Sequence, residues 1–243
     1  MVGESRKSKR IQKILDILSQ EGTVRTEELS SKVGASLTTL RRDLSILQRL
    51  GYIVKGYGFV TLLGGNPAEN GSFMNRLSMN REEKEKIAMK AVDYVSEGDV
   101  IFLDESTTCY VFAQTLVRRF KKLHIITNAI HTLLVLAQSP GFLVESTGGS
   151  LLSHFDSLVG PKAEANLKGI YAQKFFFSCK ALKQDEGTFE LNPFSASIKR
   201  IMLENSEENF LLVDHTKIGS VSPFFCIDIN DIRHIITDKE GII

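Results

Sequence analysis

The chain has 243 residues, of which 42% are hydrophobic and 24% are charged, and its formal net charge is +1. This composition is typical of a globular protein with a hydrophobic core, and the length allows one large domain or a small domain beside a medium-sized one. The basic first residues lack the apolar core of a signal peptide, and no apolar run approaches the length of a membrane span. We therefore expect a cytoplasmic protein with no membrane partner. Three scattered cysteines (Cys109, Cys179 and Cys226) and five histidines show no metal-ligand or redox spacing, so we expect reduced thiols, no metal and no cofactor.

The small net charge hides an uneven distribution. Residues 1–55 contain 11 Lys and Arg against 6 Asp and Glu, a balance of +5, which leaves −4 for the rest of the chain. A basic amino-terminal unit indicates contact with a polyanion such as DNA. The basic run at residues 6–10 is compatible with contact along phosphates and equally with a solvated terminus.

Residues 1–63 carry the pattern of three helices followed by a β-hairpin. Apolar residues recur at three- and four-residue steps in the helices, and β-rich runs flank a glycine-containing turn after them. A hairpin in this position is typical of the wing of a winged helix-turn-helix. The expected boundaries are a first helix ending at Glu21-Gly22, a short strand at Thr23-Val24, a second helix capped by Thr26 and ended by Gly34, a third helix from Ser36 to Gly51, and hairpin strands at 52–55 and 59–62.

The third helix has the features of a DNA recognition helix. Ser36 is a suitable N-cap, and we expect Leu37, Leu40, Leu44 and Leu47 to form one apolar face. The polar residues then lie on the other sides, where guanidinium groups suit phosphate or guanine and threonine hydroxyls suit phosphate or a base edge. For this helix alone, a solvated surface helix is an equal alternative. The residues predicted to bind DNA are Ser36, Thr38, Thr39, Arg41, Arg42, and Lys55 and Tyr57 of the wing.

The motif Ser36-x-x-Thr39-Leu40-Arg41-Arg42-Asp43-Leu44, followed by Leu47, Gly51 and the hairpin, resembles the amino-terminal pattern of the DeoR family of bacterial transcriptional regulators. The resemblance implies a winged helix-turn-helix that binds double-stranded operator DNA. Gly64-Gly65 lies later than the glycine pair that closes the wing in the family, and the usual basic residue before the pair is displaced.

A stretch rich in Gly, Asn and Pro follows the hairpin, at residues 64–72, and marks a domain boundary. We predict a DNA-binding domain at 1–63, a linker at 64–80 and an effector-sensing domain at 81–243. The mixed charges at residues 81–86 open a helix, and they are typical of a solvated helix face.

Short apolar runs alternate with helical segments in the remainder of the chain. Near-continuous apolar strands are expected where helices cover both faces of a sheet. The fold class is therefore α/β with a mostly parallel sheet. The expected strands are 100–103, 125–127, 142–144, 175–177 and 210–213, and the expected helices are about 108–119, 129–138, 161–170 and 195–205.

Polar residues follow each predicted strand, and ligands of such sheets bind at the carboxyl ends of the strands. The hydroxyls and free N–H groups of residues 104–108 suit a phosphate, and residues 214–217 add an acid, an imidazole and a cation. Ordinary helix caps explain each segment alone about as often, but together they predict a site for a phosphorylated polyol. The predicted effector-binding residues are Asp104, Ser106, Thr107, Thr108, Thr127, Asn128, Gly148, Gly149, Lys180, Asp214 and Lys217.

The same segments extend the resemblance to the DeoR family. Its sensor-domain signatures match Asp104-x-Ser106-Thr107-Thr108, Thr127-Asn128, Gly148-Gly149, Asp214-x-Thr216-Lys217 and Lys199-Arg200-x-Met202. The resemblance implies a fold similar to ribose-5-phosphate isomerase and an effector that is a phosphorylated sugar. Residues 194–197 depart from the pattern, because the family usually carries glutamate there.

These observations together indicate a transcriptional regulator, with repression of a carbohydrate-utilisation operon as the expected role. The expected partners are operator DNA, a phosphorylated sugar and further copies of the chain, as a dimer or tetramer. The alternative is a sugar-phosphate isomerase. Such an enzyme carries acidic residues after the fourth strand, where this chain has Ser178-Cys179-Lys180 and no carboxylate until Asp185. We therefore do not expect an enzyme.

Overall fold

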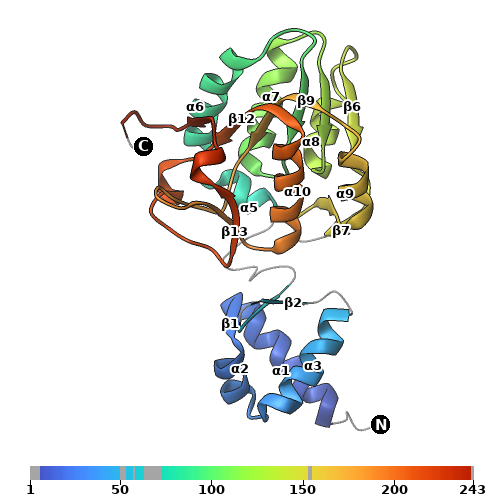
Figure 1. The fold of residues 1–243 in the computed structure, drawn as a ribbon, viewed down its shortest axis with the longest axis vertical. Helices are drawn as coiled ribbons and strands as arrows, with labels where there is room; N and C mark the ends of the chain where they lie inside the picture. The colour runs from blue at the N-terminus through green and yellow to red at the C-terminus, as the bar shows by residue number, and fades with distance from the viewer. Residues whose placement is uncertain (1–5, 50–52, 57, 63–72, 153–154, 242–243) are drawn as a thin grey trace. The chain divides into compact units, whose positions relative to one another are not determined.

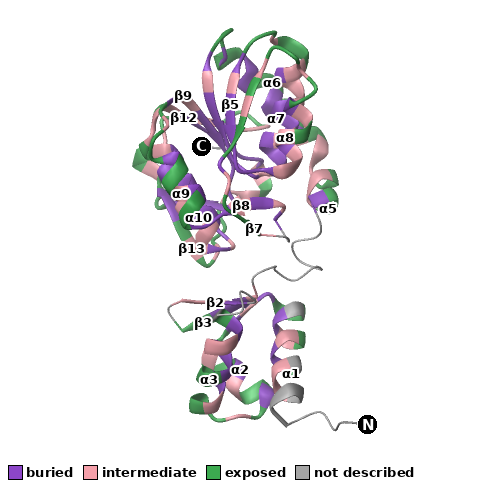
Figure 2. Cartoon of the chain, turned by 90° about the vertical axis from the view of Figure 1, so that its right-hand side faces the viewer, coloured by how far each residue is buried: buried purple, intermediate pink, exposed green. Residues whose placement is uncertain are grey.

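The computed structural model of the chain describes residues 6–49, 53–56, 58–62, 73–152 and 155–241 (Figure 1). The chain divides into two compact units, Met1–Asn75 and Arg76–Ile243. Each unit buries its own set of apolar side chains, shown in purple in Figure 2. Within the described ranges, no helix has the length and apolar character needed to cross a membrane.

The amino-terminal unit consists of helices and a small antiparallel sheet. Its elements are α1 (Arg6–Glu21), β1 (Thr23–Arg25), α2 (Thr26–Val33), α3 (Leu37–Arg49), β2 (Ile53–Gly56) and β3 (Phe59–Leu62). The sheet order is β1-β3-β2, so the strand before α2 extends the hairpin. Gly34 ends α2 with φ 75°, a left-handed conformation that glycine adopts at little cost. The predicted winged helix-turn-helix is confirmed.

Two details expected of this unit are wrong. Leu37 is 36% exposed, whereas Leu40 and Leu44 are fully buried, because the first residue of α3 lies beyond the edge of the core. Thr26 does not cap α2. Its hydroxyl donates to the carbonyl of Gly58 at 3.0 Å, and Arg25 occupies the N-cap position without a side-chain bond. Thr26 therefore ties α2 to the hairpin.

The carboxy-terminal unit is built around a six-stranded parallel sheet. The strand order is β14-β12-β9-β4-β5-β6, and every neighbouring pair is parallel. This arrangement confirms the predicted α/β class. The strands are β4 (Val100–Leu103), β5 (His124–Thr127), β6 (Leu143–Ser146), β9 (Ala172–Phe177), β12 (Ser206–Leu212) and β14 (His234–Ile236).

Helices cover both faces of this sheet (Figures 1 and 2). The helices are α5 (Phe73–Ser78), α6 (Arg81–Ala91), α7 (Thr107–Arg119), α8 (Ile130–Leu136), α9 (Pro161–Leu167) and α10 (Pro193–Glu204), with short 3-10 turns η1 (Val92–Tyr94), η2 (His215–Lys217) and η3 (Ile229–Asp231). Successive phenylalanines of β9 alternate between the faces. Phe176 packs in the cluster with α6, α7 and α8, and Phe175 and Phe177 pack in the cluster with α9 and α10. The continuous apolar run of β9 therefore results from cover on both sides.

Two smaller sheets complete the unit and were not expected from the sequence. One is antiparallel with the order β10-β11-β13, and the other is the β7-β8 hairpin. Strand β14 at the edge of the main sheet was also missed. The strands of the small sheets are β7 (Ser150–Leu152), β8 (Ser157–Val159), β10 (Ala181–Lys183), β11 (Gly187–Glu190) and β13 (Phe224–Asp228).

Candidate functional site

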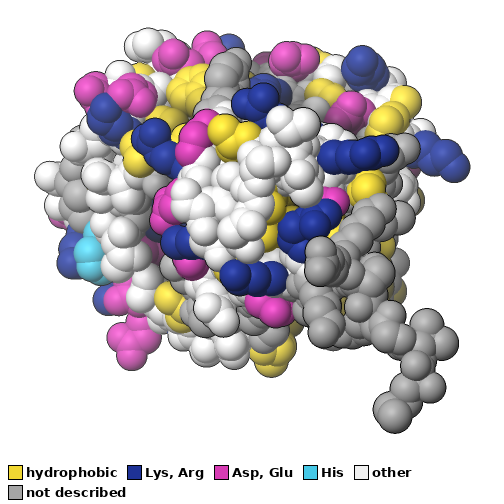
Figure 3. All heavy atoms as spheres, turned by 90° about the horizontal axis from the view of Figure 1, so that it is seen from below, with side chains coloured by type: hydrophobic (Ala, Val, Ile, Leu, Met, Phe, Trp, Pro, Cys, Tyr) yellow, Lys and Arg dark blue, Asp and Glu magenta, His cyan; other side chains and the backbone are white. Residues whose placement is uncertain are grey.

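The exposed side of α3 carries the residues predicted to bind DNA. Thr38, Arg41 and Arg42 are exposed, and Thr39 is half-buried. Ser36 caps the helix as predicted, because its Oγ accepts from the Thr39 N–H at 3.3 Å. Figure 3 views the molecule from below, and on this face Lys and Arg side chains lie next to acidic and hydrophobic ones.

An ion pair and a hydrogen bond connect α3 to the rest of the domain. Asp43 is buried and accepts from Arg10 Nε at 2.5 Å, so the basic run at residues 6–10 contributes at least one side chain to the packing of the domain. Lys55 of the wing donates to Ser45 Oγ at 3.1 Å, which places its ammonium against α3. Tyr57 and the glycine pair Gly64-Gly65 lie outside the described residues.

In the carboxy-terminal unit, the ends of β4 and β9 meet at Asp104. This carboxylate is fully buried and accepts from the backbone N–H groups of Ser106 at 2.9 Å and Ser178 at 2.8 Å. Lys199 Nζ lies 3.1 Å from it. Burial alone raises the pKa of Asp104, but the Lys199 charge and the hydrogen bonds outweigh burial and hold the pKa below its usual value. Asp104 is therefore a buried, charged carboxylate that binds the chain ends of β4 and β9 to each other and to Lys199.

Lys199 on α10 bridges two buried carboxylates. It donates to Glu190 of β11 and to the Ser178 carbonyl at 2.8 Å, and its pairing with Asp104 and Glu190 keeps its pKa above the usual value despite burial. Burial raises the pKa of Glu190 to about 7, against the opposing effect of the Lys199 charge. The family resemblance marked Lys199, but nothing in the sequence pointed to Glu190.

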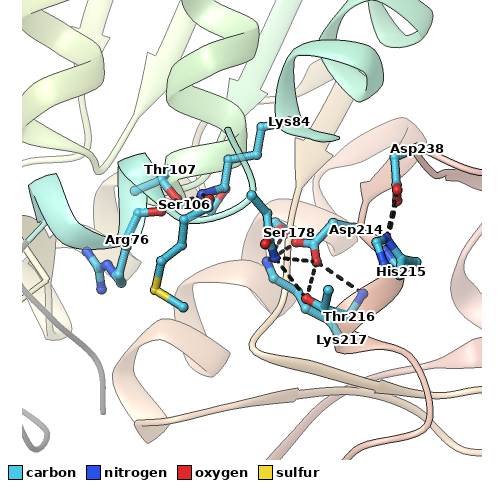
Figure 4. A network of polar contacts seen from close by, with 12 residues as sticks. Arg76, Lys84, Ser106, Thr107, Ser178, Asp214, His215, Thr216, Lys217 and Asp238 are labelled. Atoms are coloured by element: carbon cyan, nitrogen blue, oxygen red, sulfur yellow. Dashed lines mark hydrogen bonds and ion pairs between the residues drawn. The ribbon is translucent and has the colours of Figure 1, made fainter. Parts of the chain in front are cut away.

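The loop after β12 forms the other side of the site (Figure 4). Asp214 is buried and accepts from Thr216, and Lys217 Nζ donates to Ser178 Oγ at 3.0 Å and lies 3.7 Å from Asp214. Asn80, just before α6, donates to Asp214 Oδ1 at 3.1 Å and to Thr216 Oγ1 at 3.0 Å. The structure thus brings the predicted residues Asp214 and Lys217 together with the end of β9.

Two cationic residues of this region were missed from the sequence. Lys84, on the helix expected to be a solvated face, is only 4% exposed and donates to the carbonyls of Arg76 and Met79. Burial, with the nearby Lys217 charge, lowers the pKa of Lys84 to about 8. Arg76 lies with its guanidinium 5.3 Å from the Phe155 ring centroid.

Figure 4 shows two groups of side chains at these strand ends. Arg76, Lys84, Ser106 and Thr107 lie on one side, and Ser178, Asp214, Thr216 and Lys217 lie on the other. Ser106 caps α7 by accepting from the Cys109 N–H at 3.1 Å. Ammonium groups, hydroxyls and a helix amino terminus at one edge form an arrangement that binds anions such as phosphate.

Some of the remaining predicted effector residues have structural partners. Thr127 Oγ1 accepts from the Ala129 N–H at 3.1 Å, and Asn128 Nδ2 donates to the buried Glu105 at 3.1 Å. Thr108 is buried, and Lys180 is exposed in the loop after β9. Gly148 and Gly149 both have positive φ, and a Cβ at Gly149 would lie 2.6 Å from the Val159 carbonyl, so close packing accounts for that glycine.

The three thiols are buried and unbonded to one another, as expected for reduced cysteines. Burial raises the pKa of Cys179 to about 12, which makes it an unreactive thiol. Among the described residues, no group of three or more His, Cys, Asp or Glu side chains is placed to hold a metal ion.

Comparisons with known proteins agree with this geometry. A family model described as the DeoR-like helix-turn-helix domain matches residues 10–63, and one described as the DeoR C terminal sensor domain matches residues 79–239. The chain is 32% identical over 228 residues to the HTH-type transcriptional regulator GolR of Listeria innocua, covering 94% of this chain and 89% of that protein. It is 31% identical over 236 residues to the lactose phosphotransferase system repressor of Lactococcus lactis (96% and 92% covered). It is 28% identical over 237 residues to the L-fucose operon activator of Escherichia coli, with 97% of each chain covered.

Solved structures show distant likeness. Ribose 5-phosphate isomerase A of Methanocaldococcus jannaschii matches 57% of this chain and 55% of its own, with a TM-score of 0.43 and 18% identity. The eIF2B delta subunit of Chaetomium thermophilum matches 96% of this chain and 72% of its own, with a TM-score of 0.50 and 10% identity. At these identities the likeness concerns the fold alone.

The sequence matches agree with the observed domains. Both matching models describe domains of a family of transcriptional regulators, which is not a family of enzymes, so the isomerase alternative is rejected. The chain therefore belongs to the DeoR family of transcriptional regulators, with a DNA-binding helix-turn-helix domain and a carboxy-terminal sensor domain.

Proposed function

We propose that this protein represses a carbohydrate-utilisation operon and that a phosphorylated sugar, bound by the sensor domain, sets its affinity for operator DNA. The observation that carries the proposal is the convergence of Lys84, Lys217 and the amino terminus of α7 at one edge of the sheet. Relatives named for the lactose phosphotransferase system and for the L-fucose operon support a sugar as the class of effector.

The phosphate group is assigned to the ammonium groups of Lys84 and Lys217 and to the hydroxyls of Ser106, Thr107 and Ser178. Buried or half-buried cations bind a dianion more strongly than solvated ones, because less water screens the charges. The sugar hydroxyls then extend along the strand ends, toward Thr108, Thr127, Asn128, Gly148 and Gly149. Lys180 is exposed in the loop after β9, and we place it at the outer edge of the proposed site.

Operator DNA is assigned to the exposed side of α3 and to the wing. We assign Arg41 and Arg42 to phosphates or guanine edges, and Thr38 and Thr39 to phosphate or a base edge. Ser36 and Lys55 support this surface through their contacts within the domain. The proposed limits are 1–63 for this domain, 64–80 for the linker and 81–243 for the sensor, and residues 76–80 at the end of this linker already belong to the compact carboxy-terminal unit.

The effector acts by linkage. A sugar phosphate that binds one arrangement of a homo-oligomer more tightly shifts the population toward that arrangement. The shift changes the spacing of two winged helices relative to two half-sites in the operator. A coupling of about 1–3 kcal/mol is enough to change operator affinity between about five- and 150-fold.

A thermal-shift screen against phosphorylated pentoses and hexoses tests the proposal. The correct sugar phosphate is expected to raise the melting temperature, and its unphosphorylated form is not. Lys217→Ala is expected to abolish the shift, because it removes a phosphate-binding charge, and the exposed control Lys168→Ala is expected to keep it. Failure of every phosphorylated sugar to bind, or full binding by Lys217→Ala, would overturn the proposed site. Reporter expression in a strain lacking the gene distinguishes repression, our expectation, from activation.

A further inference from the structure

The residues assigned to the effector also hold the corner between α5 and α6, defined here as residues 76–80. Lys84 donates to the carbonyls of Arg76 and Met79, and Thr107 Oγ1 donates to the Arg76 carbonyl at 3.4 Å. Asn80 closes the corner by donating to Asp214 and Thr216. Every one of these contacts joins the corner to a side chain of the proposed phosphate site or to its immediate neighbour.

The corner has a special place in the chain. Its first three residues, 76–78, are the end of α5, which is the first described helix after the wing strand β3. Ten residues, 63–72, separate β3 from α5 in the sequence. Among the described residues of the sensor unit, the corner therefore lies close in sequence to the DNA-binding domain.

Lys84 links the proposed phosphate site to this corner. An ammonium group has three N–H donors, and two of them are directed at the Arg76 and Met79 carbonyls. The Lys84 residue is only 4% exposed, so little water screens its charge, and a phosphate that reaches the ammonium group competes strongly with those neutral carbonyls.

We propose that Lys84 is the positioning residue that converts effector binding into a change at the α5–α6 corner, and that this change alters operator affinity. The inference rests on the proposed function, since it requires an anionic effector at the same edge of the sheet. Effector binding and its effect on the corner are then separable. Several groups hold the phosphate, whereas only the Lys84 bonds to the Arg76 and Met79 carbonyls change when it binds.

The test compares the full-length protein with three variants. Lys84→Met keeps an unbranched side chain that is one atom shorter and removes the charge and the donors. Asn80→Gly removes the bonds to Asp214 and Thr216, and glycine tolerates the left-handed backbone of this position, φ 50°. Lys86→Met is the matched control, because Lys86 is exposed on the same helix.

The measured quantity is the ratio of operator Kd values with and without the sugar phosphate selected in the thermal-shift screen, at a concentration that saturates each variant by calorimetry. We expect a ratio between about five and 150 for the wild type and for Lys86→Met. We expect a ratio within twofold of one for saturated Lys84→Met and a reduced ratio for Asn80→Gly. Hydrogen exchange of residues 73–80 is expected to change on sugar binding in the wild type and to stay unchanged in Lys84→Met.

A wild-type ratio in saturated Lys84→Met would overturn the inference and leave the proposed function intact. If Lys84→Met does not fold, Asn80→Gly decides, and a wild-type ratio in that variant would overturn the inference. A wild-type protein whose operator affinity responds to no phosphorylated sugar would overturn the proposed function and the inference with it.

Discussion

The Lys84 side chain is buried, donates to two backbone carbonyls and lies near the ammonium group of Lys217. Its pKa of about 8 means that it is charged at neutral pH and loses the charge in mildly alkaline solution. A phosphate monoester is already a dianion above pH 7, so its own charge does not change there. The pH dependence of binding between pH 7 and 9 therefore reports on Lys84.

We expect the affinity for the sugar phosphate to fall about tenfold between pH 7 and pH 9, as the charged fraction of Lys84 falls. Calorimetric titration at pH 7, 8 and 9 measures this change. Lys84→Arg is the control, because a guanidinium stays charged over the whole range, and its affinity is expected to stay level. Equal pH profiles for the two proteins would exclude Lys84 as the titrating group.

Glu190 gives a second pH dependence, of the folded state itself. Because its pKa of about 7 in the folded protein exceeds the ordinary value of 4.5, the folded state binds a proton that the unfolded chain has released. This contribution to stability is complete below pH 4.5 and is lost as the pH rises through 7.

We therefore expect the free energy of unfolding to fall by about 2.5 kcal/mol more between pH 5 and pH 8 in the wild type than in Glu190→Gln. Urea denaturation at both pH values measures the difference. The exposed control Glu207→Gln is expected to follow the wild type. A Glu190→Gln variant that also follows the wild type would show that this carboxyl stays ionised.

Among the helices and strands, α3 gives the most specific prediction, which concerns its two exposed arginines. Loss of a good base contact costs about 1–3 kcal/mol, so Arg41→Ala or Arg42→Ala is expected to weaken operator binding about five- to 150-fold. Fluorescence anisotropy with labelled operator measures the loss. Arg118→Ala, an exposed arginine of the sensor domain, serves as the control. Unchanged affinity in both α3 variants would remove α3 from the interface.

The elements that the sequence predicted correctly are those with strong periodicity. The apolar runs of β4 and β9 stand out because both faces of those strands are covered. Strand β14 has three residues and depends on pairing with β12, and the sheet β10-β11-β13 joins segments far apart in the chain. Such pairings leave no local pattern, because tertiary contacts create them.

The candidate site was predictable only where it follows strand ends. The position of Asp104, Asp214 and Lys217 at one edge of the sheet could be predicted because parallel strands deliver their carboxyl ends to that edge; their role in effector binding stays a prediction. Lys84 was missed because its neighbours in the sequence are charged, which is typical of a solvated helix. Only the surrounding fold shows that this one lysine turns inward.

At the scale of the whole molecule, the division of charge governs DNA binding. Residues 1–55 carry a balance of +5 and the rest carries −4, so the field that attracts DNA originates in the amino-terminal domain. Each phosphate neutralised on binding releases a counterion, which makes affinity depend on salt.

We expect operator affinity to fall about a thousandfold between 50 and 200 mM salt if an oligomer contacts about six phosphates. Anisotropy titrations over this range measure the slope. The sugar-binding affinity of the sensor domain is expected to fall much less over the same range, because its charges are partly buried. A flat salt dependence of operator binding would be incompatible with phosphate contacts by the basic domain.

Asp238 lies close to the end of the chain, yet it accepts from the His215 N–H at 2.8 Å and contacts His215 Nδ1 at 2.7 Å. The Val213 N–H also bonds to the Ile236 carbonyl at 3.0 Å. Residues 236 and 238 thus support the loop that carries Asp214 and Lys217, far in sequence from the recognition helix. If the proposed function holds, a nonsense allele shortly before codon 236 is expected to give a product that still binds the operator but no longer responds to the sugar phosphate, which reporter expression with and without the sugar measures.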